Sequence, residues 1–374
     1  MSNQAHSPGL WALAWRRLRA DTVAMVSLAV VMLFLAMLVL SATGLIVADW
    51  EDEVGVNYAP PGFVANADID AGGPAQKAPS APPAAVRENA FDPLAGDIAA
   101  IRAQTGQGAG QGGVAAPDMY GIVDPLAAEM AELRAATLGA AAPARLARRA
   151  TLPFGADKWG HDIIKKTIKG AETSIVVGLV AALLAVVLGT LFGALAGYYG
   201  GLVDDLFNWF YSIFTSIPSI LMILTVAAVL QQKGVATIVL ILGLTGWTGP
   251  FRLIRAEYMK HKGREYVMAA DAIGASTWRK MASHIFPNVS HVALVQLSIL
   301  VVGFIKAEVI LSFLGFGVPV GVVSWGSMLN EAQNELILGK WWQLTAAAIA
   351  MAVLVTAFSL FTDALRDALD PKLK

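Results

Sequence analysis

Apolar residues gather in six long runs that are separated by shorter polar stretches. A helix needs about 20 predominantly apolar residues to cross the hydrocarbon core of a bilayer. Each run is close to this length or longer, so the pattern predicts six transmembrane helices. The runs cover residues 22–48, 173–203, 206–232, 234–251, 281–305 and 341–362.

Composition supports this prediction. The 374 residues are 56% hydrophobic and 15% charged, which is typical of an all-α integral membrane protein. The formal net charge of −1 gives no reason to expect a nucleic-acid partner, and the lipid membrane is the partner that composition indicates. The absence of cysteine excludes disulfides, iron–sulfur clusters and thiol catalysis.

The basic residues near the two ends of the chain predict its orientation, because cytoplasmic segments of membrane proteins are enriched in lysine and arginine. These residues are Arg16, Arg17, Arg19, Arg366, Lys372 and Lys374. Six spans also place both termini on one side, so residues 1–21 and 363–374 are predicted to be cytoplasmic tails. The first run is expected to be retained, because its 27 uncharged residues exceed the roughly 7 to 15 of a signal-peptide core.

The stretch from Tyr266 to Asn288 reads as two short helices joined at a hinge. Gly274 provides the backbone freedom that a residue just past a helix end needs, Ser276 can cap the second helix, and Pro287 is expected to limit it. This stretch belongs to a water-facing insert, residues 252–288, between two predicted spans. Seven basic residues lie between positions 251 and 290, and they predict that the insert is cytoplasmic.

The external segment, residues 49–153, is rich in alanine, proline and glycine and poor in aromatic residues. Residues 92–104 and 124–138 each have an aspartate cap, a following proline and an apolar stripe of helical period. The glycine-rich residues 106–113 indicate disorder between them. We favour a spacer loop for this segment over the alternative, which is a contact surface for an external partner.

Residues 154–172 are predicted to form a tight turn followed by an amphipathic helix in the outer membrane interface. Gly155, Asp157, Gly160 and Asp162 are typical of the turn, and the aspartates are interpreted as turn and capping residues rather than metal ligands. Ile163, Ile164 and Ile168 share one face of the helix, while Lys165, Lys166 and Lys169 are expected to reach toward lipid headgroups.

Within the core, residues 173–362, three positions are candidates for the gate or pathway. Pro218 would kink the third span, which is also a routine packing feature. Lys306 and Glu308 lie at the outer end of the fifth span, on different sides of the helix; a pathway role and a structural role stay open for both. Trp341 and Trp342 are interpreted as interface anchors. The five histidines show no metal-ligand spacing, so no metal site is predicted.

Several motifs, in order from Gly155 to the C-terminus, carry a family resemblance. They are Gly155–Asp162 with the pattern Gly-x-Asp-x-x-Gly-x-Asp, Gly-Tyr-Tyr-Gly-Gly at 197–201, Pro218, the insert with Ala269, Ala270, Gly274 and Pro287, His-Ile-Phe-Pro-Asn at 284–288, and the segments 307–317, 324–329 and 363–371. The chain resembles the permease subunits of ATP-binding-cassette (ABC) importers, and more narrowly the C-type permeases of dipeptide, oligopeptide and nickel uptake. Met268 stands where the family has glutamate.

The resemblance implies a type I importer permease fold with a long external loop between helices 1 and 2. It implies a bacterial inner-membrane location and three kinds of partner: a second homologous permease, ATPase subunits and an external solute-binding protein. The chain contains no Gly-x-x-x-x-Gly-Lys-Ser/Thr phosphate loop. We therefore expect a non-catalytic subunit without a cofactor of its own, with ATP and magnesium bound by the partner ATPases.

The insert is then expected to be the coupling loop to the ATPase. Its predicted contact residues are Tyr266, Met268, Ala269, Ala270, Asp271, Ile273, Gly274 and Pro287. Small and apolar side chains let a helix settle into a protein groove. Peptides are the expected cargo, with nickel or another small solute as the alternative. Two alternative functions fit the sequence less well. An ion-coupled secondary transporter would normally show inverted repeats and charged residues near the membrane midplane, and neither is evident here. A membrane scaffold would not need the hinged insert.

Overall fold

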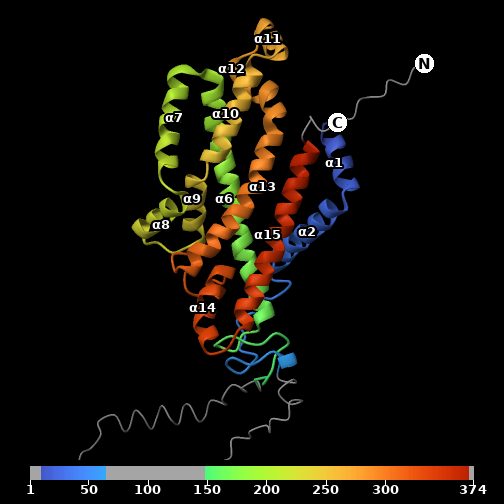
Figure 1. The fold of residues 1–374 in the computed structure, drawn as a ribbon, viewed down its shortest axis with the longest axis vertical. Coiled ribbons are helices and arrows are strands. Elements are labelled where there is room, and N and C mark those ends of the chain that lie inside the picture. The colour runs from blue at the N-terminus through green and yellow to red at the C-terminus, as the bar shows by residue number, and fades with distance from the viewer. Residues whose placement is uncertain (1–9, 65–147, 370–374) are drawn as a thin grey trace, which may run out of the picture. The chain divides into compact units, whose positions relative to one another are not determined.

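The computed structural model describes residues 10–64 and 148–369. The predicted helices at 92–104 and 124–138 and the spacer at 106–113 lie outside the described residues. The described residues form helices joined by short loops, with three isolated β-bridges and no named strand among them. Figure 1 shows the helices running side by side.

The helices that match the predicted spans are α2 (Thr22–Ala42), α6 (Ile163–Tyr199), α7 (Gly201–Ser216) with α8 (Ser219–Leu230), α9 (Val235–Thr245) with α10 (Thr248–Lys262), α13 (Phe286–Phe313) and α15 (Trp342–Leu369). The remaining described helices are α1 (Leu10–Ala20), α11 (Glu265–Ala272), α12 (Thr277–Arg279), the π-helix η1 (Lys280–Ile285) and α14 (Trp325–Ile337). In the described part of the chain, five helical segments are long and apolar enough to cross a membrane, and the bent pair α7–α8 is a sixth if its two helices count as one span.

Helix α6 is the central element of the fold, and small residues let its neighbours approach closely. Gly189, Gly193 and Gly197 recur at every fourth position of α6. A Cβ atom at these positions would lie 2.5 to 2.8 Å from backbone oxygens of the segment 247–255. Helices in membranes associate through such close backbone contact, because burying apolar surface gains nothing against lipid. The glycine stripe therefore fixes α10 against α6.

Helix α6 also begins earlier than predicted. Asp162 caps it, because its Oδ1 accepts a 2.8 Å hydrogen bond from the backbone N–H of Ile164. The prediction of a separate amphipathic helix within 154–172 is therefore wrong: the segment after Asp162 continues directly into the span. No stop signal lies between the lysines and the apolar run, so the helix does not break there.

Helix α10 likewise continues through the charged residues to Lys262, where Gly263 ends it. The insert 252–288 thus starts inside a helix. The predicted kink at Pro218 is a complete break, with an angle of 87° between α7 and α8. Proline disfavours helical backbone in the preceding residue, and Ile217 is extended, with φ −104° and ψ 133°.

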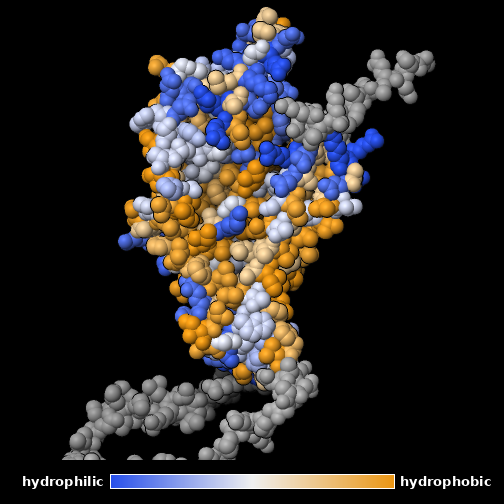
Figure 2. Space-filling model, in the orientation of Figure 1, coloured by the Kyte–Doolittle hydropathy of each residue, from blue (hydrophilic) through white to orange (hydrophobic). Residues whose placement is uncertain are grey.

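The first and last described helices, α1 and α15, pack together. Ala14 and Leu18 of α1 pack in one apolar cluster with Leu365, Ala368 and Leu369 of α15. Figure 1 shows this cluster's helices toward the same end as α11. In Figure 2, apolar residues dominate the middle of the face, and hydrophilic residues gather toward the α11 end. The even number of spans predicted from the sequence agrees with this arrangement.

Candidate functional site

The candidate docking surface is formed by α11, the turn after it and α12. Helix α11 is attached to the body of the protein by Val267 and Ala270, which are both 4% exposed. Its other face is open: Met268 is 55% exposed and Ile273, at the end of the helix, is 84% exposed. Several exposed apolar side chains gathered on one short element outside the membrane spans indicate an interaction surface.

The hinge predicted at Gly274 is confirmed. Gly274 has φ +79°, a conformation that other residues rarely adopt, and its N–H donates to the carbonyl of Asp271. Ser276 caps α12, because its Oγ accepts a 3.4 Å hydrogen bond from the N–H of Arg279. The turn places Trp278, which is 65% exposed, beyond the end of α11.

The structure separates the predicted contact residues into exposed residues, one buried residue, Ala270, and Pro287, which lies elsewhere. Tyr266, Met268, Ala269, Asp271, Ile273 and Gly274 are exposed on or just after α11. Ala270 faces inward and belongs to the attachment of α11, so the prediction that it is a surface residue is wrong. Asp271 forms an ion pair with Lys280, which ties the turn to η1.

Pro287 lies away from this surface, as the second residue of α13. The prediction that it limits the second helix is wrong, since Thr277–Phe313 runs on as one span. A proline near the start of a helix removes an N–H that has no partner there. Here the π-helix η1 comes directly before it, and the wider π turn accommodates the missing donor.

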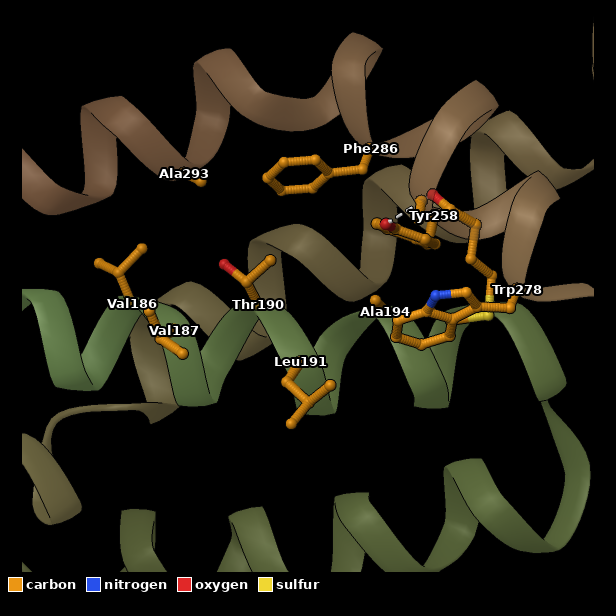
Figure 3. Close-up of a pocket in the computed structure, with 11 residues that line it drawn as sticks. Val186, Val187, Thr190, Leu191, Ala194, Tyr258, Trp278, Phe286 and Ala293 are labelled. Carbon is orange, nitrogen blue, oxygen red and sulfur yellow. Dashed lines mark hydrogen bonds between the residues drawn. The ribbon is translucent and has the colours of Figure 1, made fainter.

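An apolar cavity of about 330 Å³ lies beside the docking surface, between α6, α10, η1 and α13. Figure 3 shows Phe286 facing Thr190 of α6 across the cavity, and Trp278 beside Ala194 of the same helix. The hydroxyl of Thr190 is buried and has no hydrogen-bond partner among the described residues. The cavity adjoins the apolar cluster in which Val267 of α11 packs.

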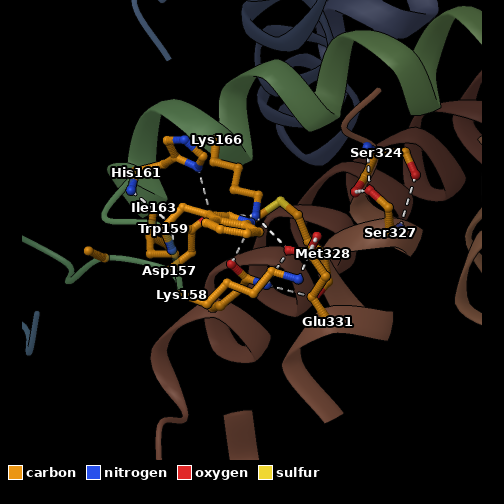
Figure 4. Close-up of polar contacts among 12 residues, drawn as sticks. Asp157, Lys158, Trp159, His161, Ile163, Lys166, Ser324, Ser327, Met328 and Glu331 are labelled. Carbon is orange, nitrogen blue, oxygen red and sulfur yellow. Dashed lines mark hydrogen bonds and ion pairs between the residues drawn. The ribbon is translucent and has the colours of Figure 1, made fainter. Parts of the chain in front are cut away.

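A second constellation, which the sequence did not predict, lies at the opposite end of the helices from α11. Lys166 is 3% exposed, and its Nζ donates to Asp157 Oδ2 at 2.7 Å, Glu331 Oε2 at 2.6 Å and Gln343 Oε1 at 3.3 Å. Figure 4 shows Lys166 pointing from α6 toward Asp157 and Glu331. The prediction that Lys166 reaches toward lipid headgroups is therefore wrong.

Asp157 organises the turn before α6. Its Oδ1 accepts from the N–H of Trp159 at 2.8 Å and of His161 at 3.0 Å, and its Oδ2 lies 2.9 Å from His161 Nδ1. Burial acts to raise the pKa of Asp157, but the hydrogen bond from His161 and the charge of Lys166 outweigh it and hold this pKa well below its usual range. The turn role expected for Asp157 and the cap expected for Asp162 are confirmed.

The tryptophans near the start of α15 do not behave alike. Trp342 is 3% exposed, and its Nε1 donates to the carbonyl of Ala156 at 2.7 Å. The prediction of an interface anchor is wrong for Trp342, because this residue joins α15 to the turn 155–162. Trp341 is partly buried beside Phe63, with ring centroids 6.3 Å apart.

The three gate or pathway candidates do not meet in one site. Glu308 is fully buried, and its carboxylate accepts from Ser174 at 2.6 Å and from Ser312 at 2.7 Å. Lys306 is exposed, so the prediction that the two residues face different sides is confirmed. Pro218 is exposed at the break between α7 and α8. Among the described residues, no group of three or more His, Asp or Glu side chains could hold a metal ion.

These features define a class: a multi-pass α-helical membrane protein, with several apolar spans around a tightly packed α6 and an exposed helical turn at one end. Comparison with known families narrows it. Residues 189–374 match the family described as the binding-protein-dependent transport system inner membrane component, and residues 9–61 match the N-terminal TM domain of oligopeptide transport permease C.

Related proteins agree. The dipeptide transport system permease protein DppC of Bacillus subtilis is 36% identical over 221 residues, which cover 59% of this chain and 69% of DppC. The oligopeptide transport system permease proteins OppC of B. subtilis and Salmonella typhimurium are each 37% identical, over 59% of this chain and 72% of their own length. The chain therefore belongs to the permease family of binding-protein-dependent ABC importers, whose members are non-catalytic subunits.

Proposed function

We propose that this chain forms half of the translocation pathway of a bacterial inner-membrane importer for dipeptides or oligopeptides. A second homologous permease forms the other half, ATPase subunits bind ATP and magnesium, and an external binding protein delivers the peptide. The names of the relatives support the peptide cargo, since the DppC and OppC proteins are named for dipeptide and oligopeptide transport.

The observation that carries the coupling role is the exposed apolar end of α11. Ile273, Met268 and Trp278 present apolar surface on a rigid turn, which suits insertion into a groove of a partner protein. We assign this surface to the ATPase. Both termini and α11 then lie in the cytoplasm, which agrees with the lysine and arginine residues of the insert and tails.

The packing below α11 provides a route for coupling. Val267 packs in one cluster with Tyr258 of α10, Met281 and Ile285 of η1, and Val289 of α13. Tyr258 also donates from its hydroxyl to the carbonyl of Met281 at 3.2 Å. When ATP closes the ATPase subunits, displacement of α11 would move η1 and α13 together, because packed interiors transmit rather than absorb strain.

The gate remains part of the same proposal. The break at Pro218 separates two half-spans that can change their angle, and Glu308 with Lys306 lies on α13, the helix that η1 joins to the docking surface. We assign the α7–α8 break to gating. Glu308 is assigned a role in holding α13 against α6 through Ser174.

Affinity purification of the tagged chain in mild detergent tests the proposal. We expect a second permease and ATP-binding subunits to copurify, and the binding protein of the same system to bind peptides. Recovery of a stable chain alone would contradict the importer assignment in favour of ion-coupled transport. Recovery of the ATPase with a binding protein selective for nickel would overturn only the peptide cargo.

A further inference from the structure

Glu335 of α14 is a buried carboxylate that the fold leaves without a partner. Its side chain is 2% exposed, and neither Oε1 nor Oε2 has a hydrogen-bond partner in the described part of the chain. An ionised carboxylate removed from water without a hydrogen bond or counter-ion is strongly disfavoured. Such a group pairs with a cation, accepts hydrogen bonds from buried water or binds a proton, and only a cation or a proton neutralises its charge.

The cations around Glu335 are already engaged by other groups. Lys166 of α6 is shared by Asp157, Glu331 and Gln343. Lys158, in the turn before α6, lies 3.9 Å from Glu331. His161 of the same turn contacts Asp157.

Lys340, just before α15, offers no counter-charge either, because its Nζ lies over the ring of Trp342, 5.4 Å from the ring centroid. The described residues also contain no cluster of three or more acidic or histidine side chains that could hold a metal ion.

A proton is the ligand that would neutralise Glu335. The cluster contains three carboxylates, Asp157, Glu331 and Glu335, and two lysines, the buried Lys166 and the partly exposed Lys158, so one negative charge is in excess. Asp157 and Glu331 are both paired with Lys166, whereas Glu335 is not. Burial raises the pKa of Glu335 to about 7; Lys166 opposes this rise, and the charges of Asp157 and Glu331 reinforce it.

We propose that Glu335 is a proton-binding site that controls how tightly α14 packs against the turn 155–162 and the start of α15. The proton comes from water and returns to water. The protonated form is neutral and suits its buried place, whereas the ionised form draws water toward the end of α14 and loosens it. The proposal goes beyond peptide import, because it concerns the response of the α14 end to pH whatever the cargo.

The direction of the effect follows from linkage. The pKa of Glu335 in the folded chain, about 7, lies above its ordinary value of 4.5, so the folded chain binds this proton more tightly than the unfolded chain does. The stability that Glu335 contributes is complete below about pH 4.5 and is lost as the pH rises through about 7. Above neutral pH, the end of α14 is therefore packed less tightly than at acidic pH.

The test is the pH dependence of the thermal unfolding midpoint of the full chain in detergent. We expect the midpoint of the natural chain to fall as the pH rises through 7, and that of Glu335→Gln, which mimics the protonated form, to stay level and be higher at alkaline pH. Glu265→Gln, at an exposed glutamate of α11, is the matched control and should keep the natural slope. An unchanged slope in Glu335→Gln would overturn the proposal.

A second measurement keeps the proposal testable if Glu335→Gln does not fold. The chain has no cysteine, so a single introduced cysteine reports on its own position. Ala332→Cys places a thiol at a fully buried position of α14, and Ile337→Cys places one at a position that is 84% exposed. We expect the labelling rate of Ala332→Cys, divided by that of Ile337→Cys, to rise at least tenfold from acidic to alkaline pH. A constant ratio would show that α14 does not loosen.

Discussion

The two ends of the described bundle differ in where their charges lie, although both expose an isoleucine that is 84% open to solvent, Ile273 at the α11 end and Ile337 at the α14 end. At the α11 end, Ile273 and Trp278 lie open to solvent. At the α14 end, Lys166 and Asp157 are buried together. An exposed apolar surface gains stability only when another molecule covers it, whereas a buried ion pair is already completed within the chain. We infer that the apolar surface of the α11 end is covered by a partner protein, whereas the buried ion pairs of the α14 end are completed within the chain.

Removing the buried cation should have the largest effect. In Lys166→Met, Asp157 and Glu331 would keep their charges without a counter-ion, and we expect the free energy of unfolding to fall by about 3 to 5 kcal/mol. Denaturant titration of the chain in detergent measures this. Lys169→Met is the control on the same helix: its partner Glu172 is partly exposed, so we expect a loss of about 1 kcal/mol or less. Equal losses would show that the burial of Lys166 adds nothing to the stability of the α14 end.

A charge on the docking surface should affect association and leave folding unchanged. In Ile273→Asp, we expect binding of the copurified ATPase to weaken at least tenfold, since burying an isoleucine contributes about 1.5 to 3 kcal/mol. The thermal midpoint should not change. Ile337→Asp is matched in residue type and exposure, as both isoleucines are 84% exposed, but it lies on α14. Loss of the ATPase in this control as well would show that the effect is not specific to α11.

Blocking the hinge tests whether the docking surface must be rigid. Gly274 has φ +79°, so Gly274→Val should cost about 1 to 2 kcal/mol in local stability. We expect amide hydrogens of α11 to exchange about 5 to 30 times faster, and the measurement is hydrogen exchange with mass spectrometry. Gly263 also has open space around it but a φ of −88°, so Gly263→Val should leave the exchange of α11 unchanged. Similar rates in the two variants would contradict the role given to Gly274.

The smallest effect should come from one hydrogen bond at the α14 end. Trp342→Phe removes the donor to the carbonyl of Ala156 and should lower the free energy of unfolding by about 1 kcal/mol. Trp341→Phe is the control, because no hydrogen bond from the Trp341 indole is present in the described ranges. A denaturant titration that gives the same value for both variants would indicate that the bond contributes nothing.

The sequence predicted the features that depend on neighbouring residues. Apolar runs mark the spans, and Gly274 with Ser276 marks the hinge, because helix ends are determined by the residues within one turn of them. Positions of helix starts were less accurate: α6 begins at its aspartate cap, Asp162, and not where the lysines end.

The polar cluster could not be predicted in the same way. Lys166 and Glu331 are 165 positions apart, and no periodicity links them. Their meeting depends on how α6 packs against α14. The same limit explains Trp342, whose position beside the turn follows from the fold and not from its place at the end of a span. The pattern of small glycines on α6 was visible in the sequence, and it is the signal from which the close α6–α10 packing could have been found.

The separation of the cluster in sequence also imposes an order in time. Asp157 is nine positions from Lys166, so this pair can form as soon as the start of α6 is made, whereas Glu331 follows 165 positions later. At about 5 to 20 residues per second, the ribosome needs roughly 10 to 30 s to deliver it. During synthesis Lys166 can therefore pair with Asp157 before Glu331 exists. A nascent chain that ends before α14 would therefore lack Glu331 and would leave Lys166 with Asp157 as its one carboxylate partner of the two.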